Sequence, residues 1–135
     1  MQTLVLKEAQ LVENYLFIED RHERLNAIMT HSAAGCHLPD QERDADLLVK
    51  GCSSQVWLEV KLVNEKLKIR FAADSAMVKG LVALLVDLYQ GAAASEVETF
   101  KPTLFDQLEL TRMLSQTRLN GLAQVESAFL RAANI

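Results

Sequence analysis

The sequence has few of the residues that mark specialised classes of protein. Two cysteines, Cys36 and Cys52, are too few for a disulfide scaffold. The net charge is −4 and no run of Lys and Arg occurs, so the basic footprint of a nucleic-acid-binding protein is missing. No stretch approaches the roughly 18 successive apolar residues of a membrane-spanning helix, and the N-terminus lacks the basic-then-apolar order of a signal peptide. We therefore expect a cytoplasmic protein with free thiols, no nucleic-acid partner and no membrane association.

The composition that remains is that of a globular protein. Half of the 135 residues are apolar and 24% are charged. A chain of this length can bury an ordinary core without help from a metal or a disulfide. We expect residues 1–135 to form a single domain.

The spacing of apolar residues predicts helices packed around a small antiparallel sheet. Helical spacing covers Leu4–Phe17, Asp20–Met29, Ser75–Gln90 and Gln116–Ala133, whereas Val56–Val63 and Leu67–Phe71 alternate as two strands joined by residues 64–66. Trp57 falls on the charged face of the first strand, where it packs beneath a helix or lies near the cysteine turn. Helices on both sides of a hairpin indicate an α+β plan rather than alternating βαβ units.

Local signals predict where these elements begin and end. Asp74 or Ser75 is placed to cap the third helix, and Gly91 to end it. Ser95 is placed to cap a short turn of helix, and residues 104–110 form another short helix. Residues 32–46 are small and polar, which indicates a loop with one helical turn after Pro39.

Cys52 is the candidate reactive residue. It lies beside Gly51 in a small, polar turn directly before the first strand, where little side-chain bulk crowds a thiol. Because a free thiol titrates near ~8.5, reactivity at neutral pH calls for a nearby positive group or hydrogen-bond donors. Lys50 is two positions away, and Arg118 could approach through folding. A buried structural cysteine at the mouth of a strand explains the same position equally well.

Arg118 is a second residue that stands out. It lies at the start of the last predicted helix, where the helix dipole does not favour a cation. This position indicates a role in tertiary structure, with a solvated surface arginine as the alternative.

Histidine-dependent chemistry finds less support. A cysteine protease or acyltransferase needs a histidine base, but none of the three histidines, His22, His31 and His37, stands in a context that points to Cys52. Cys36, His37, Cys52 and His31 could supply four zinc ligands, yet their spacing matches no paired zinc motif. We expect no metal site.

Nucleotide cofactors are also not indicated. The five glycines are scattered, and Lys79-Gly80 falls inside a predicted helix rather than after a strand. We expect no cofactor.

Three stretches in a fixed order carry a family resemblance. They are Gly51-Cys52-Ser53-Ser54-Gln55-Val56-Trp57, the run from Asp74 to Leu85, and the run from Leu114 to Leu122. They are similar to G-C-x-S-Q-V-W, D-x-A-x-I/V-V-K/R-G-L-x-A-L/V and L-S/T-x-S-R-x-x-G-L of the SufE family, and Leu38-Pro39 and residues 105–110 also fall in its order. The chain thus resembles, over roughly residues 8–133, acceptors that take persulfide sulfur from a cysteine desulfurase during iron–sulfur cluster assembly.

The resemblance implies a function and a partner. Cys52 would carry a transferable persulfide, and the protein would raise the turnover of its cysteine desulfurase, a pyridoxal-phosphate enzyme, as an accessory protein rather than a stand-alone enzyme. A cluster scaffold protein is a further candidate partner. In the family the cysteine loop can tuck the side chain inward and swing it out toward the desulfurase. The family's arginine and aspartate match Arg118 and Asp74, which with Gly51, Ser54 and Gln55 would stabilise the loop or contact the partner.

The sequence also departs from the family pattern. Ala72 stands where many members carry Asp, and Thr117 replaces a Ser. Cys36 precedes Leu-Pro, as either an incidental cysteine or a second sulfur relay. A thiol-containing adaptor that binds a partner without turnover is the alternative function, and Cys52→Ser distinguishes it from a sulfur acceptor.

Overall fold

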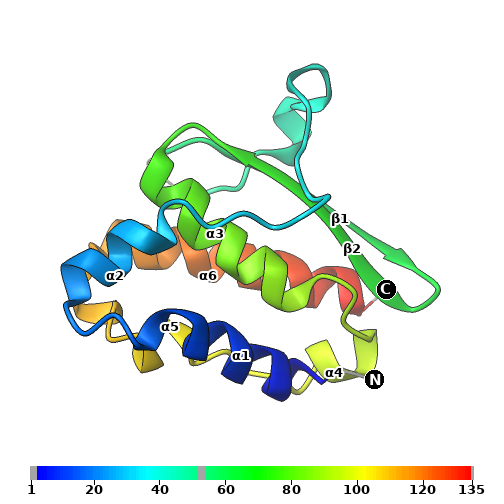
Figure 1. The fold of residues 1–135 in the computed structure, drawn as a ribbon. Helices are drawn as coiled ribbons and strands as arrows, with labels where there is room; N and C mark the ends of the chain where they lie inside the picture. Colours follow the sequence, from blue (N-terminus) through cyan, green and yellow to red (C-terminus); the bar gives the residue numbers. More distant parts are fainter. Residues whose placement is uncertain (1–2, 52–53, 135) are drawn as a thin grey trace.

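The structure is a computed structural model that describes residues 3–51 and 54–134. Its helices are α1 (Leu4–Leu16), α2 (Arg21–Ile28), α3 (Ala76–Tyr89), α4 (Ala94–Val97), α5 (Leu104–Gln107) and α6 (Gln116–Ala133), and its strands are β1 (Val56–Val63) and β2 (Lys66–Ala73). Short 3-10 turns cover Asp40–Glu42, Ala45–Leu47 and Thr111–Met113. Figure 1 shows the antiparallel hairpin lying over α3 and α6, with α1, α2 and α5 beyond them. The α+β prediction is confirmed.

The hairpin is tighter than the sequence suggested. The register pairs Val56 with Ala73 and Val63 with Lys66, so Lys66 begins β2 instead of lying in the connection. The turn consists of Asn64 and Glu65, whose φ angles are +53° and +64°. Two residues of positive φ give the backbone twist that suits a two-residue hairpin turn.

One face of the hairpin closes the core. Leu67, Ile69 and Phe71 on β2 are all buried, and the two strands pack on α3 and α6. Burying such side chains contributes about 1.5–3 kcal/mol each. This packing fixes the hairpin, and with it the segment that precedes β1.

Helix α3 is the centre of the core, as its wide apolar surface predicted. Ten of its 14 residues are buried, Gly80 among them. A Cβ on Gly80 would lie 2.3 Å from the carbonyl oxygen of Ile28 and 2.5 Å from Cα of Met29. The end of α2 therefore packs on α3 at a distance that only glycine permits.

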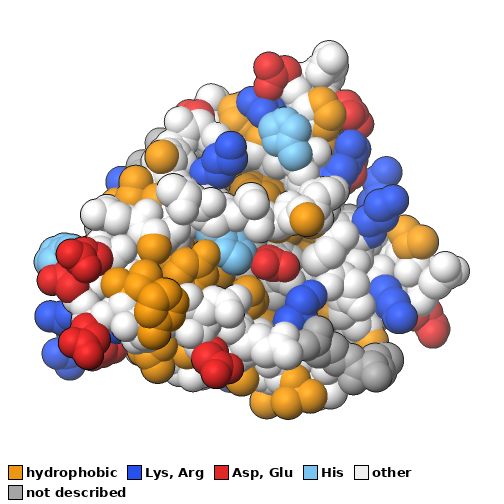
Figure 2. All heavy atoms as spheres, viewed as in Figure 1, with side chains coloured by type: hydrophobic (Ala, Val, Ile, Leu, Met, Phe, Trp, Pro, Cys, Tyr) orange, Lys and Arg blue, Asp and Glu red, His pale blue; other side chains and the backbone are white. Residues whose placement is uncertain are grey.

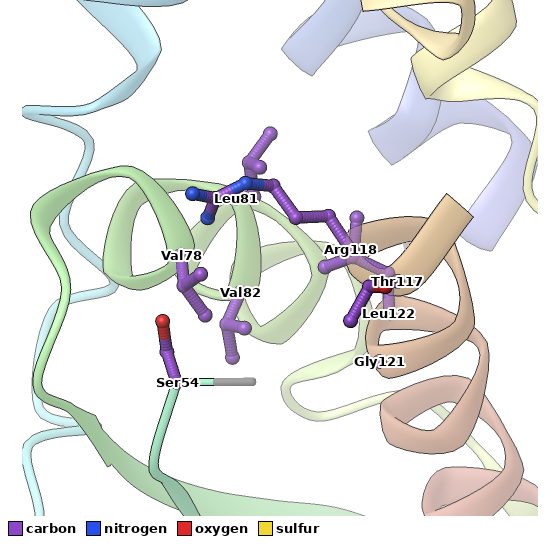
Figure 3. A pocket seen from close by; sticks show the side chains of 8 residues that line it. All are labelled: Ser54, Val78, Leu81, Val82, Thr117, Arg118, Gly121 and Leu122. Carbon is purple, nitrogen blue, oxygen red and sulfur yellow. The ribbon is translucent and has the colours of Figure 1, made fainter. Parts of the chain in front are cut away.

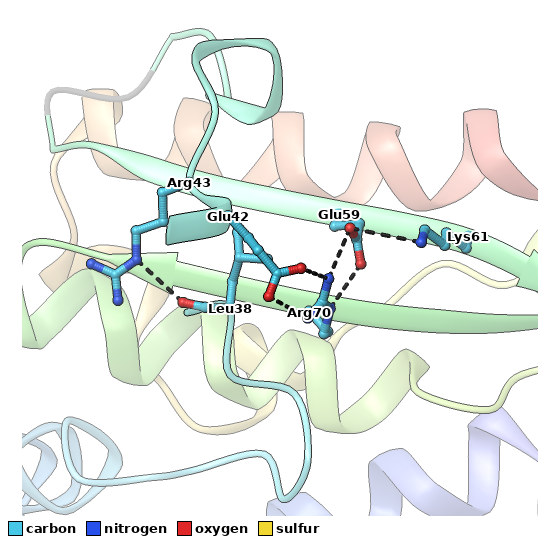
Figure 4. A network of polar contacts seen from close by, with 6 residues as sticks. All are labelled: Leu38, Glu42, Arg43, Glu59, Lys61 and Arg70. Carbon is cyan, nitrogen blue, oxygen red and sulfur yellow. Dashed lines mark hydrogen bonds and ion pairs between the residues drawn. The ribbon is translucent and has the colours of Figure 1, made fainter. Parts of the chain in front are cut away.

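The opposite face of the hairpin is crossed by residues 38–49, which we call the strap. Arg70 on β2 holds the strap because its guanidinium donates to Glu59 on β1 and to Glu42 on the strap, each at 2.8 Å. Figure 4 shows the three side chains meeting above the sheet. The hydrogen bonds from Arg70 lower the pKa values of both carboxyl groups.

The strap also covers Trp57. The guanidinium carbon of Arg43 lies 5.6 Å from the centroid of the Trp57 ring, within the range of a cation–π contact, while its Nε donates to the carbonyl of Leu38 at 3.2 Å. Leu48 bridges to Trp57 through the backbone. Trp57 is thus packed under the strap rather than under a helix. The strap leads into the cysteine turn, and Trp57 follows that turn on β1.

The predicted ends of α3 are confirmed at Ser75 and Gly91, whereas the predicted cap at Ser95 is wrong. Ser75 occupies the N-cap position of α3 but its side chain makes no capping hydrogen bond, and Asp74 bonds elsewhere. Helix α4 begins after Ala93, so Ser95 lies inside the helix instead of capping it. Gly91 follows α3 with φ of +78°, the left-handed conformation expected of a residue that ends a helix.

Helix α1 leaves apolar side chains in contact with solvent. Val5, Leu6, Leu16 and Phe17 are 44–76% exposed, and Figure 2 shows hydrophobic side chains gathered over the region of α1 and α2. None of the helices in residues 3–51 and 54–134 has the length and hydropathy that a membrane crossing requires.

Candidate functional site

Cys52, together with Ser53, lies outside the described residues, so the site is built from its neighbours. Gly51 precedes it with φ of +87°, a conformation that L side chains rarely adopt. A Cβ at Gly51 would lie 3.6 Å from Cγ of Gln124 on α6, an ordinary contact. The backbone conformation of the turn, rather than a lack of space, therefore requires glycine before the cysteine.

Backbone hydrogen bonds hold both ends of the cysteine turn. On the strap side the N–H of Val49 donates to the carbonyl of Val56 at 2.8 Å. On the other side the N–H of Gln55 donates to the Asp74 carboxylate at 3.0 Å, and the N–H of Asp74 donates to the Gln55 carbonyl at 3.1 Å. These bonds hold the chain at Val49 and Gln55, between the strap and β1, and we call residues 50–55 the cysteine loop.

A small cavity opens beside this loop. Its volume is about 20 Å³, room for about one water-sized sphere. It is lined by Ser54 of the loop, by Val78, Leu81 and Val82 of α3, and by Thr117, Arg118, Gly121 and Leu122 of α6. Figure 3 shows these side chains converging from the two helices and the loop. The walls are mostly apolar, and Arg118 supplies the charge.

Arg118 reaches from α6 across to α3, as Figure 3 shows. Its backbone N–H donates to the Ser115 side chain, which caps α6. Its Nη1 atom is buried and has no hydrogen-bond partner among the described residues. Leaving a buried donor unsatisfied costs about 1–3 kcal/mol, and more for a charged group. Arg118 thus carries a charged donor beside the cavity that a negatively charged hydrogen-bond acceptor would satisfy.

A comparison with models of protein families identifies the family of this chain. The profile of the SufE family, described as an Fe-S metabolism associated domain, matches residues 9–133. The chain belongs to the SufE family. A SufE-like protein of Rhizobium etli, itself uncharacterized, is 30% identical over 134 residues, which cover 92% of this chain and 90% of that protein.

Other SufE-family relatives carry more informative names. The cysteine desulfuration protein SufE of Wigglesworthia glossinidia brevipalpis is 30% identical and covers 95% of this chain and 90% of its own length. The sulfur acceptor protein CsdE of Escherichia coli K12 is 33% identical, covering 84% of this chain and 77% of its own. The solution structure of a hypothetical protein from Thermus thermophilus has a TM-score of 0.74 at 18% identity, over 95% of this chain and 93% of that one. That likeness shows the fold.

The described site residues that were predicted for this SufE-family chain lie in three separate places around the cysteine loop. Ser54 and Arg118 line one cavity, whereas Gln55 and Asp74 bond each other at the end of the cysteine loop. Gly51 sits on the other side of the loop, against Gln124. The cavity walls formed by α3 and α6 were not singled out from the sequence, although the second and third motif stretches contain them. Their apolar spacing was the available signal.

Cys36 has none of the features of a reactive thiol. It is 1% exposed, and its Sγ lies 3.6 Å from the Ala34 carbonyl oxygen. Burial raises the pKa of the thiol, and the negative charge of Asp87 raises it further. Its own carbonyl accepts from the N–H of Phe71 at 2.8 Å, so the residue is part of the sheet edge.

The histidines do not form a catalytic or metal site in the described part of the chain. Both ring nitrogens of His31 are hydrogen-bonded, one to the Tyr15 hydroxyl and one to the Asp87 carboxylate. His22 and His37 are exposed. No three His, Cys, Asp or Glu side chains outside residues 52–53 and the termini are grouped as metal ligands.

Proposed function

We propose that this chain is a sulfur acceptor that takes persulfide sulfur from a cysteine desulfurase onto Cys52, for iron–sulfur cluster assembly. The observation that carries the proposal is the small cavity beside the cysteine loop, which is lined by Arg118, an arginine whose buried Nη1 has no partner among the described residues. An apolar cavity with one buried cationic nitrogen suits a thiolate or a persulfide anion. The sulfur acceptor CsdE and the desulfuration protein SufE among the relatives support the same role.

The reaction needs no general base on this chain. The Cys52 thiolate attacks the outer sulfur of a donor cysteine persulfide, so that a new S–S bond forms to Cys52 while the donor S–S bond breaks. The donor cysteine leaves as a thiolate and takes up a proton, and Cys52 holds the sulfur as a persulfide. No oxidant or reductant is consumed.

Each neighbour of Cys52 has a role in this proposal. Gly51 provides the positive φ that turns the chain into the loop, and the Gln55–Asp74 pair closes it. Ser54 brings the loop to the cavity wall, two residues after the cysteine. Arg118 stabilises the anionic form of the thiol or of the bound persulfide, because an opposite charge nearby favours the charged form.

The partner of this acceptor is a cysteine desulfurase, which itself uses pyridoxal phosphate. Removing the sulfur from the desulfurase cysteine frees it for the next cycle, so the acceptor enhances desulfurase turnover without being a stand-alone enzyme. A scaffold protein for cluster assembly is the proposed recipient, and the cytoplasm is the proposed location. We propose that residues 1–135 act as one domain.

Intact-mass measurement tests the assignment. The purified protein is mixed with a cysteine desulfurase and free cysteine, alongside Cys52→Ser and Cys36→Ser. A gain of about 32 Da, one sulfur, that is lost only in Cys52→Ser establishes the carrier. No gain with a desulfurase that demonstrably binds overturns it and favours the thiol-containing adaptor. A gain lost in both variants makes Cys36 a relay.

A further inference from the structure

We propose that a groove beside the cysteine loop binds an acidic segment of the sulfur-donating partner, an inference that rests on the proposed function. The groove has a volume of about 400 Å³ and lies between the strap, β1 and α6. The residues that matter for binding are Lys50, Leu58, Gln124, Ala128 and Arg131, with Asp46 at the strap end. It is separate from the small cavity under Arg118, with which it shares no lining residue.

The groove lies beside the described part of the cysteine loop. Lys50, two residues before Cys52 in the sequence, lines the groove, and a Cβ on Gly51 would lie 3.6 Å from Cγ of Gln124, a residue of the groove wall. In sulfur transfer the donor sulfur must come within bonding distance of Cys52. The donor protein therefore has to cover the surface around the cysteine loop, and this groove is part of that surface.

The charges of the groove select the partner. Lys50 and Arg131 are exposed, and neither has an ion-pair partner within residues 3–51 and 54–134, while the whole chain carries a net charge of −4. Asp46 is the single carboxylate among the lining residues. A guanidinium binds a carboxylate through two parallel hydrogen bonds. The groove thus favours a carboxylate-bearing segment and disfavours a basic one.

Two apolar residues also line the groove. They are Leu58, which is 7% exposed, and Ala128, which is half-buried. Gln124 has a side-chain amide that can pair with a peptide backbone. An extended segment with one acidic and one small apolar side chain fits this combination of cations, amide and floor.

The test compares two double variants with the same change in charge. Lys50→Glu with Arg131→Glu reverses the charge of the groove. Lys66→Glu with Lys68→Glu alters exposed lysines that pair with Val63 and Lys61 toward the turn end of the hairpin. Binding to each cysteine desulfurase of the same organism is measured at about 0.05 M and about 0.3 M salt. We expect the groove variant to bind at least about tenfold more weakly at low salt and to lose most of its salt dependence. The hairpin variant should bind like the wild type.

Sulfur uptake separates this inference from the proposed function. Uptake from glutathione persulfide, a donor with no docking surface, should be equal in the wild type and in the single variant Arg131→Glu, because Arg131 lies on α6 outside the cysteine loop. The groove proposal is wrong if the groove variant binds the desulfurase with wild-type affinity. It is also wrong if both double variants bind equally more weakly than the wild type. If the wild type binds a desulfurase but gains no sulfur from it, the proposed function fails while the binding comparison still decides the groove. If the wild type binds none of the desulfurases, both are overturned.

Discussion

Asp74 and Gln55 form a reciprocal pair, in which each residue donates its backbone N–H to the other, at 3.0 Å to the carboxylate and 3.1 Å to the carbonyl. The pair joins the start of α3 to the end of the cysteine loop, 19 positions earlier in the chain. Of the two residues that the sequence offered as caps of α3, Ser75 occupies the N-cap position and Asp74 bonds the end of the cysteine loop.

Removing this carboxylate should loosen the loop without unfolding the protein. Asp74→Ala leaves the N–H of Gln55 without its acceptor, and we expect a loss of about 0.5–1 kcal/mol in stability. Hydrogen exchange of the Gln55 amide should become faster while exchange in the α3 core is unchanged. Asp74→Asn is the control, since its side-chain oxygen can still accept. Unchanged exchange at Gln55 in the alanine variant would contradict this prediction.

Arg118 should control the reactivity of Cys52 if the proposed function is correct. Arg118→Met keeps an apolar stem in the cavity wall but removes the cation, so the pKa of the Cys52 thiol should rise. In a Cys36→Ser background we expect alkylation by iodoacetamide at neutral pH to slow about tenfold, as for a shift of one pKa unit. Arg112→Met, at an exposed arginine of the turn Thr111–Met113, is the matched control. Equal rates in both variants would count against the role of Arg118.

Gly80→Ala should destabilise the protein even though alanine is the better helix former. The new Cβ would meet backbone atoms of Ile28 and Met29 at 2.3 and 2.5 Å, and backbone cannot rotate away as a side chain can. We expect a loss of about 1–3 kcal/mol or more in urea unfolding. Gly35→Ala, with nothing within 4 Å but φ of +76°, should lose only the cost of its backbone conformation, about 1–2 kcal/mol. A stabilised Gly80→Ala variant would show that α2 and α3 are not in contact as described.

Glu126 should make stability depend on pH near neutrality. It lines a cavity with Tyr89, Phe100 and Leu130, and burial raises its pKa to about 7, against about 4.3 in an unfolded chain. Between these values the folded protein holds a proton that the unfolded chain releases, so stability should fall as the pH rises through this window. Urea unfolding at pH 5, 6, 7 and 8 measures the slope.

Substitution isolates the contribution of this carboxyl group. Glu126→Gln should remove the extra loss of stability between pH 5 and 8 and should be more stable than the wild type at pH 8. Glu98→Gln, at an exposed position lining the same cavity, should leave the slope in place. If the stability of Glu126→Gln still falls between pH 5 and 8 as in the wild type, another titratable group causes the pH dependence.

The sequence predicted what depends on local spacing. Helix α6 runs over the predicted residues 116–133, and the hairpin follows its alternating pattern, because period alone distinguishes a helix from a strand. The family resemblance pointed to Asp74 as a loop-stabilising residue, but its pairing with Gln55 was not predicted because the two come from distant segments. The prediction at Ser95 was wrong because a cap depends on where the preceding turn places the chain. The strap over Trp57 likewise requires Arg70 and Glu42 to meet from segments far apart in the sequence.

The candidate site divides in the same way. The sequence shows the small residues around Cys52. It also shows Arg118 in the first turn of a helix, where the helix dipole does not favour a cation. That Arg118 turns into a cavity with room for one small atom is a property of the crossing of α3 and α6, which no local pattern contains.

The cysteine loop is a short tether. Val49 and Gln55, whose backbone N–H groups bond Val56 and Asp74, are its anchor points, and Cys52 is three residues from each. An extended chain spans at most about 3.6 Å per residue, so three residues of chain reach roughly 10 Å from either anchor at most. Under the proposed function, a donor sulfur would have to come within this short reach of the two anchors before it could be transferred.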